Sequence, residues 1–132
     1  MTLNKSIDFL KEIDRIWNTP VFDEIVEWAK EGVSQLGCSP CTLAVGIGRS
    51  HYEAASLMLQ AQADGRYDVQ SDMEQEITRR VNEAEIGPLG LGGSTSVLAT
   101  FMKVGPQRAS GVRIVCVRPT CCFGPRIVTV EL

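Results

Sequence analysis

The stretch GCSPCTLAVGIGRSHYEAA, residues 37–55, combines the local signals that decide the fold. The run CTLAVG at 41–46 is short, apolar and bounded by turn residues, which predicts a buried strand. The residues GIGRS then form a turn, and Ser50 with Glu53 makes an S-x-x-E capping box. A helix is therefore predicted from His51 to about Ala63. A buried strand that leads directly into a capped helix is typical of proteins whose helices pack on a sheet.

Helical and strand patterns continue on both sides of this unit. Apolar residues recur with helical spacing over 3–17, 21–36 and roughly 71–84. Three strand-like runs follow, at 97–104, 111–118 and 126–132. This order predicts a single domain over 1–132 of the α/β (or α+β) class, with a mixed β-sheet of about four strands packed with about four helices.

The charge and hydropathy of the chain exclude several classes of partner. The 132 residues include 13 basic and 16 acidic side chains, for a net charge of −3, which argues against a nucleic-acid-binding surface. No apolar run is long enough to span a bilayer, and the first residues lack the apolar region of a secretory signal. The sequence therefore predicts a cytoplasmic protein with neither a nucleic-acid nor a membrane partner.

Two glycine turns are candidate anion sites. The first precedes a capped helix, whose N-terminus offers unpaired N–H groups to a phosphate or carboxylate. The second, IGPLGLGGSTS at 86–96, could form a polar nest for an oxyanion. The alternatives are a tight strand–helix turn and a flexible connection, neither with a ligand. The predicted ligand-contacting residues are Gly46, Gly48, Arg49, Ser50, Gly92, Gly93 and Ser94.

Five cysteines and one histidine are the remaining candidates for chemistry. The odd number of cysteines and the lack of a secretory signal predict reduced thiols, of which Cys116 occupies a core strand position. The other four equal the number needed for structural zinc, whereas iron–sulfur clusters can be held by widely spaced single cysteines. His51 is a candidate general acid or base, or simply an exposed residue. The candidate metal ligands are Cys38, Cys41, Cys121 and Cys122.

Three segments over residues 22–126 resemble one known family. CSPCTLAVGIGRSHYEAASLM resembles the segment C-P-P-x-x-x-x-G-x-G-G-T-x-x-x-A-x-x-L of the oxygen-sensitive iron–sulfur hydro-lyases. NEAEIGPLGLGGSTSVLA is similar to their N-x-x-G-I-G-P-x-G-L-G-G-x-T-T-A-L segment, and CCFGPR is similar to their later C-W-x-x-R-R. These enzymes are the class I fumarases and the alpha subunit of L(+)-tartrate dehydratase. Residues 1–20, with the first predicted helix, lie outside the resemblance.

The resemblance implies a [4Fe–4S] cluster that takes part in removing water from a hydroxy-dicarboxylic acid, or in adding water to form one. Cys38 matches the middle cluster ligand of the family and Cys122 matches the last, with Cys41 and Cys121 as substitutes for a missing one. Arg126 matches an arginine of the last segment and is a predicted substrate contact. The glycine loops match backbone loops near the cluster, with Gly48-Arg49-Ser50 in place of G-G-T.

Parts of the family pattern have no counterpart in the chain. The first cluster cysteine, in a C-Q-D-T-G motif, a substrate-contacting histidine and the whole beta part are missing. The resemblance therefore covers the C-terminal half of an alpha subunit and implies complementary alpha and beta chains in a homo- or hetero-oligomer. Two other interpretations stay open: a non-catalytic relative that binds a small carboxylate, a phosphate or a protein partner, and a structural zinc domain.

Overall fold

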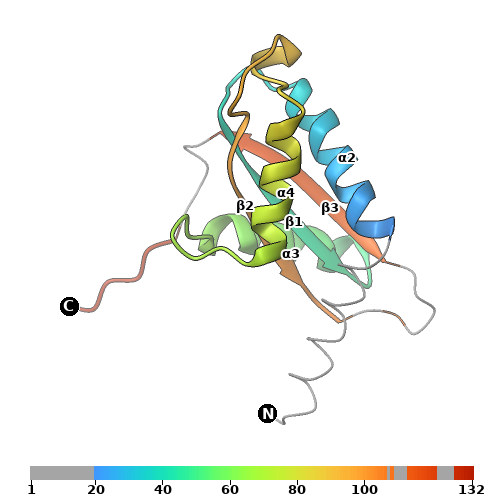
Figure 1. Cartoon of the computed structure of the whole chain (residues 1–132). Helices are drawn as coiled ribbons and strands as arrows, with labels where there is room; N and C mark the ends of the chain where they lie inside the picture. The colour runs from blue at the N-terminus through green and yellow to red at the C-terminus, as the bar shows by residue number, and fades with distance from the viewer. Residues whose placement is uncertain (1–19, 107, 109–112, 122–126) are drawn as a thin grey trace.

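The computed structural model describes residues 20–106, 108, 113–121 and 127–132. Its elements, labelled as in Figure 1, are α2 (Pro20–Ser34), β1 (Cys41–Gly48), α3 (His51–Asp64), α4 (Asp72–Glu83), the short 3-10 helix η1 (Pro88–Gly90), β2 (Val97–Val104) and β3 (Ile114–Cys121). The described part of the chain thus holds three α-helices and a three-stranded mixed sheet, which confirms the predicted fold class.

The strand after the first cysteines is the centre of the sheet. The strand order is β2-β1-β3, with β1 parallel to β2 and antiparallel to β3. At the start of β1, Cys41 pairs with Val97 on one side and with Cys121 on the other; at its end, Gly48 pairs with Ile114. All eight residues of β1 are buried, because a central strand covered on both faces has no solvent side.

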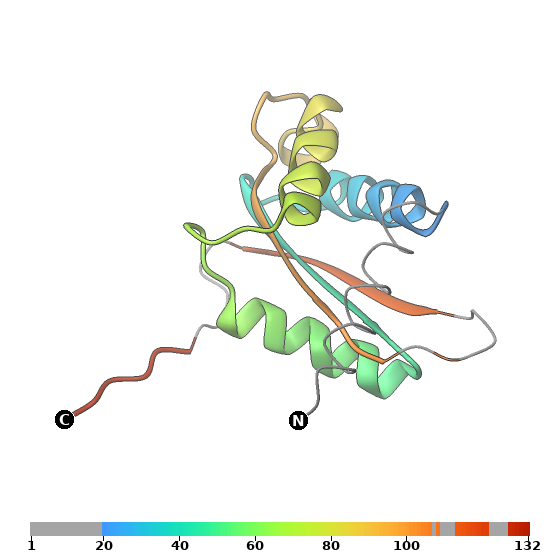
Figure 2. The same cartoon turned by 60° about the horizontal axis from the view of Figure 1, so that its bottom comes forward.

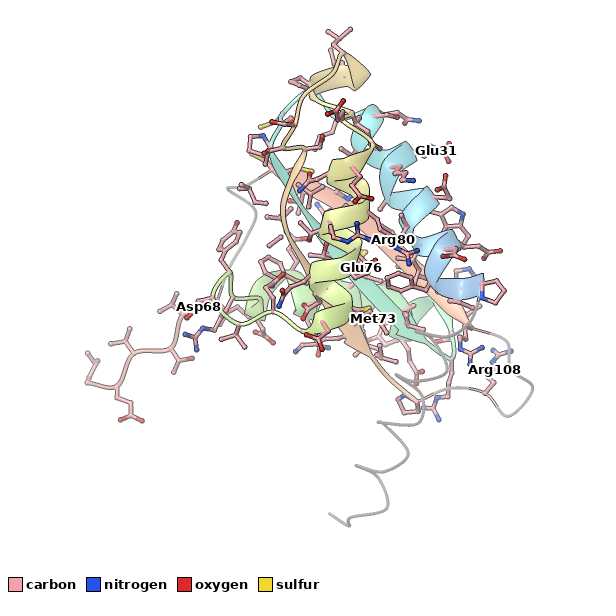
Figure 3. All side chains as sticks on the ribbon, in the orientation of Figure 1. Glu31, Asp68, Met73, Glu76, Arg80 and Arg108 are labelled. Carbon is pink, nitrogen blue, oxygen red and sulfur yellow. The ribbon has the colours of Figure 1, made fainter. Side chains whose placement is uncertain are left out.

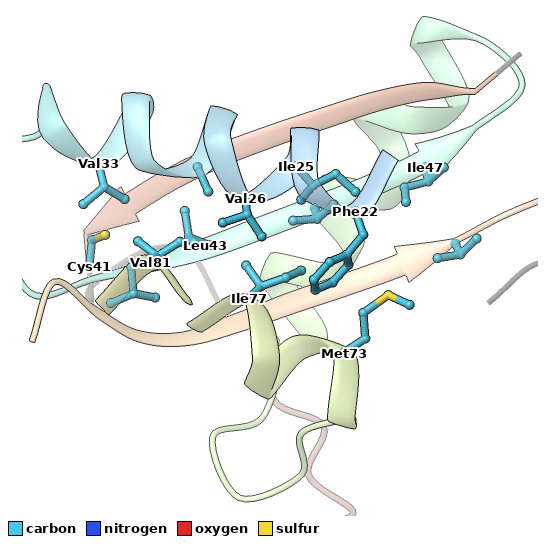
Figure 4. Close-up of a cluster of buried hydrophobic side chains, with 14 residues drawn as sticks. Phe22, Ile25, Val26, Val33, Cys41, Leu43, Ile47, Met73, Ile77 and Val81 are labelled. Carbon is cyan, nitrogen blue, oxygen red and sulfur yellow. The ribbon is translucent and has the colours of Figure 1, made fainter. Parts of the chain in front are cut away.

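Helices cover both faces of this sheet. Figure 2 shows α3 on one face and α2 with α4 on the other. Alternate residues of β1 point to opposite faces, and those on the α2 and α4 side enter the main core, part of which Figure 4 labels. The buried residues of that core are Phe22, Ile25, Val26, Ala29, Val33, Cys41, Leu43, Val45, Ile47, Met73, Ile77, Val81, Val97 and Val104.

Serine caps begin the two helices that follow β1. The Ser71 hydroxyl accepts from the Glu74 N–H, and the Glu74 carboxylate accepts from the Ser71 N–H, which completes a capping box at α4. At α3 the Ser50 hydroxyl accepts from the Glu53 N–H, as predicted. The Glu53 carboxylate, however, bonds the N–H of Arg49, so only half of the predicted box forms there.

Two expectations about the ends of the chain need comment. The predicted strand over 126–132 is wrong, because the described residues 127–132 are not in a strand and lie exposed, extending away from the sheet in Figure 1. Their β-branched side chains favour a strand. Among the described contacts, however, the Ile127 N–H donates to Ala63 O in α3, so the segment begins against that helix rather than along a strand. The predicted helix over 3–17 lies outside the described residues.

The third strand begins and ends later than predicted. The pattern placed it at 111–118, whereas β3 runs through Ile114–Cys121 and includes Pro119. Proline is tolerated at a sheet edge, and β3 is an edge strand of the described sheet. This shift brings Cys121 into the sheet.

Among the described residues, no helix has both the length and the apolar character that a membrane crossing requires.

Candidate functional site

Three of the predicted metal-ligand cysteines lie at one end of the sheet. Cys38 is exposed on the segment before β1, and Cys121 is the half-buried last residue of β3. Their sulfur atoms are 3.5 Å apart, although the residues are 83 positions apart in sequence. Cys41 is the Cα partner of Cys121 but is fully buried in the core.

Because it is buried, the Cys41 thiol differs in acidity from the thiols of Cys38 and Cys121. Loss of solvation raises the pKa of the Cys41 thiol to about 11, and the nearby sulfurs of Cys38 and Cys121 add to the effect. A thiol binds metal as the thiolate. Cys41 therefore stays protonated near neutral pH, and its main contact is with core side chains (Figure 4).

The donor set of this end fits an iron–sulfur cluster only in part. Thiols are the right donors, but cysteines on two irons of one cubane have sulfurs about 6–7 Å apart, and Cys38 and Cys121 are much closer. Only one of the two can therefore serve such a cluster in this arrangement. Within the described residues, no group of three or more His, Cys, Asp or Glu side chains is placed to hold a metal ion. Cys122 lies outside the described residues.

The second glycine loop lies at the same end, but the N–H groups of its glycines are used internally. The Gly92 N–H bonds Ile86 O at 2.7 Å, and the Gly93 N–H bonds Glu85 O at 3.2 Å. The Leu89 N–H bonds Leu36 O, which fastens the loop just before Cys38. These glycines therefore serve the loop's own structure, whereas the polar residues Ser94 and Thr95 are exposed. Ligand contact by Gly92, Gly93 and Ser94 stays a prediction.

Glycine is required at one position of this loop for two reasons. Gly87 has a φ of 66°, and a Cβ there would lie 2.0 Å from Gly92 O. Glu85 also has a positive φ, 47°, at the position where the family segment quoted above has glycine. Left-handed backbone is unfavourable for residues with a side chain, so Glu85 is a local departure from that pattern that the fold tolerates at its surface.

Asn82 and Ser96 hold this loop, and the sequence patterns did not single them out. The Asn82 side chain accepts from the N–H groups of Ser96 and Val97 and donates to Val97 O, at 2.9, 2.9 and 3.0 Å. The fully buried Ser96 accepts from the Gly87 N–H with its hydroxyl and from the Cys41 N–H with its carbonyl. The asparagine that opens the quoted segment was the available signal.

The first glycine turn has a packing role at the other end of the sheet. A Cβ on Gly46 would lie 2.1 Å from Ala54 O, and one on Gly48 would lie 3.0 Å from Ala54 N. Both glycines therefore let α3 approach β1 closely. Both are buried within β1 rather than exposed in a turn, so a ligand role for them stays a prediction without direct support.

Arg49 is engaged by its own neighbour. Its guanidinium makes two hydrogen bonds to the Glu53 carboxylate, at 2.7 and 3.1 Å, and its backbone N–H makes a third. The Arg108 Nε donates to Arg49 O at 2.8 Å. The turn therefore carries a formed ion pair, and Arg49 would have to leave Glu53 to bind a substrate carboxylate.

Because of this ion pair, we expect the Glu53 carboxyl to titrate at an unusually low pH. The side-chain and backbone N–H groups of Arg49 lower the pKa of Glu53 to about 2. Because the folded-state pKa is lowered, the pair contributes stability above the unfolded-state value of about 4.3 and loses it as the pH falls toward 2. We expect Arg49→Leu to raise the Glu53 pKa toward its ordinary range. Carboxyl NMR titration measures both values.

The control for that titration is Arg66→Leu, which removes an arginine paired with Asp68 and should leave Glu53 unchanged. A Glu53 pKa near 4.3 in the unaltered chain would contradict the ion pair.

His51, the first residue of α3, is exposed beside this pair. Its proposed acid–base role stays a prediction, and Arg126 lies outside the described residues.

The predicted site residues thus form two groups at opposite ends of β1. Cys38, Cys41, Cys121 and the loop over 86–96 lie at its start, whereas Gly48, Arg49, Ser50 and His51 lie at its end. Figure 3 shows Arg108, which contacts Arg49, at the end of the molecule opposite η1. Eight residues of strand separate the groups by about 23 Å at 3.3 Å per residue. Within one copy of this arrangement, a short dicarboxylate cannot contact both groups.

A model of the family described as fumarate hydratase (Fumerase) matches residues 9–131. No curated protein matches the chain. The matched range includes both glycine loops and all five cysteines. The chain therefore belongs to the fumarate hydratase family of hydro-lyases.

Proposed function

We propose that the chain is a component of a [4Fe–4S]-dependent hydro-lyase that acts on a hydroxy-dicarboxylic acid of the fumarate/malate or tartrate type. The observation that supports this most directly is that Cys38 and the loop over 86–96, which match two different family segments, meet at one end of the sheet. Family membership over residues 9–131 supports the reaction class.

In this proposal Cys38 and Cys122 hold the cluster, and complementary alpha and beta hydro-lyase chains supply the remaining ligand and catalytic groups. When bound, the cluster would supply an open iron as a Lewis acid for the substrate hydroxyl and carboxylate. The contribution of this chain is a rigid edge for the site. Asn82 and Ser96 hold the loop against β1, and the exposed Ser94 side chain faces outward as a substrate contact.

The experiment is anaerobic reconstitution of the full chain with iron and sulfide. We expect a visible absorbance band and bound iron and sulfide in the unaltered chain and in the control Cys116→Ser, because Cys116 lies in mid-strand opposite Gly46, away from the cysteine end. Cys38→Ser should lose most of this uptake, since it removes an exposed donor and no core contact. Equal iron and sulfide uptake by Cys38→Ser and the unaltered chain would refute the ligand assignment.

One observation favours structural zinc as a second candidate. Two thiolates on one tetrahedral zinc, with Zn–S bonds of about 2.3 Å, have sulfurs about 3.8 Å apart, which is close to the 3.5 Å between Cys38 and Cys121. Metal analysis of anaerobically purified protein distinguishes the two candidates. One equivalent of zinc without iron would support the zinc domain, and iron with sulfide would support the hydro-lyase component.

A further inference from the structure

We propose that Cys38 and Cys121 are a redox pair that forms a reversible disulfide when the metal-free chain meets a peroxide. The hydro-lyase proposal uses Cys38 and Cys122 and gives Cys121 no role. The 3.5 Å between the two sulfurs exceeds a disulfide bond, of about 2.05 Å, by only about 1.5 Å. Rotation of one exposed side chain covers such a difference without moving the strands.

The positions of the two cysteines favour this pair over the neighbouring one. Cys38 is exposed on the segment before β1 and is open to an oxidant. Cys121 is held at the end of β3 by strand pairing with Cys41, so the position of its thiol is fixed by the sheet. Cys41 is the direct cross-strand neighbour of Cys121, but its fully buried sulfur lies among core side chains and is closed to a peroxide.

The chemistry balances with hydrogen peroxide as the oxidant. The Cys38 thiolate attacks one peroxide oxygen, the O–O bond breaks, and Cys38 becomes a sulfenic acid as one water is released. The Cys121 sulfur then attacks the Cys38 sulfur and displaces the hydroxyl as a second water. Two thiols are oxidised to one disulfide, one peroxide is reduced to two waters, and a thiol reductant reverses the change.

The consequence for metal binding rests on the proposed function, whereas the disulfide itself does not. A sulfur in a disulfide has no thiolate to give to iron. If Cys38 is a cluster ligand, oxidation of the pair closes the site to reloading until it is reduced. The pair would then protect an empty site from the irreversible sulfinic and sulfonic states.

The test uses the reduced, metal-free full chain, treated with hydrogen peroxide and then alkylated. We expect a mass lower by about 2 Da, from the loss of two hydrogens, before alkylation. Non-reducing peptide mapping should join the peptide that contains Cys38 to the peptide that contains Cys121. Thiol reductant should restore the original mass.

Single variants assign the two partners. Cys38→Ser and Cys121→Ser should lose the crosslink, whereas Cys116→Ser and Cys122→Ser should keep it. Persistence of the crosslink in Cys121→Ser, its loss in Cys122→Ser, or no crosslink in the unaltered chain would overturn the proposal. Cys38 is exposed, so its variant reports on the pair without disturbing the core, and circular dichroism checks that Cys121→Ser is folded.

These outcomes are separable from those of the proposed function. Crosslinking is measured by mass in the absence of metal, and cluster binding is measured by iron and sulfide content under reducing conditions. A chain that forms the crosslink but takes up no iron would refute the proposed function alone. A chain that binds iron through Cys38 but forms no crosslink would refute the redox pair alone.

Discussion

Gly46→Ala is expected to lower the free energy of unfolding by about 3 kcal/mol or more, the upper range for overpacking a core. The added Cβ would lie 2.1 Å from Ala54 O and 2.4 Å from Met58 N. Both are backbone atoms of α3, so no rotamer change relieves the overlap, and the helix must move away from β1. Urea denaturation followed by circular dichroism measures the loss.

The matched control is Gly37→Ala, which adds the same methyl group where there is room. Its Cβ would meet only the Leu89 Cδ2, at 3.8 Å, an ordinary contact. We expect a change within about 0.5 kcal/mol for this variant, as for other surface substitutions. Similar losses for both variants would show that the close approach of α3 to β1 is not what requires Gly46.

Asn82→Ala is expected to lower the free energy of unfolding by about 3 kcal/mol, because each polar group left without its partner costs about 1–3 kcal/mol. The substitution removes the bonds to the N–H groups of Ser96 and Val97 and to Val97 O. These bonds join α4 to the start of β2, beside Cys41. Amide hydrogen exchange at Ser96 and Val97 should therefore accelerate, together with a lower urea midpoint.

Asn82→Asp distinguishes the two acceptor contacts of the Asn82 side chain from its one donor contact. The carboxylate keeps both acceptor contacts, but its second oxygen replaces the donor and repels Val97 O. We therefore expect amide exchange at Ser96 and Val97 to stay slow in this variant, even though the free energy of unfolding falls. Unchanged exchange at Ser96 and Val97 in the alanine variant, or equally fast exchange in the alanine and aspartate variants, would contradict the role of Asn82 in holding this loop.

Much of the fold follows from local patterns. The apolar run after Cys41 is the central strand, Ser50 caps α3, and the helical spacing over 71–84 matches α4 (Asp72–Glu83). These features depend on neighbours within a few residues in sequence, so local sequence patterns are enough to predict them. The expected strand at the C-terminus is wrong because β-propensity does not say where a segment lies in the fold, and Ile127 bonds α3 rather than a strand.

The candidate site was predictable as a set of residues but not as an arrangement. Family segments pointed to Cys38 and to the loop over 86–96, and β3 brings Cys121, rather than a residue of either segment, to within 3.5 Å of Cys38. Arg49 was expected to supply a cation, yet its charge is already paired with Glu53. Side-chain partners of this kind depend on the three-dimensional fold, which the spacing of residues along the chain does not reveal.

The sequence by itself determined the fold class, the family, the strand that forms the centre of the sheet and the thiols that are candidates for metal. Tertiary structure decided which of these meet. Because β1 lies between β2 and β3 and runs parallel to one and antiparallel to the other, it gathers Cys38, Cys121 and one glycine loop at its start. The same strand carries the other glycine turn to its far end, where close packing with α3, rather than a ligand, accounts for Gly46 and Gly48.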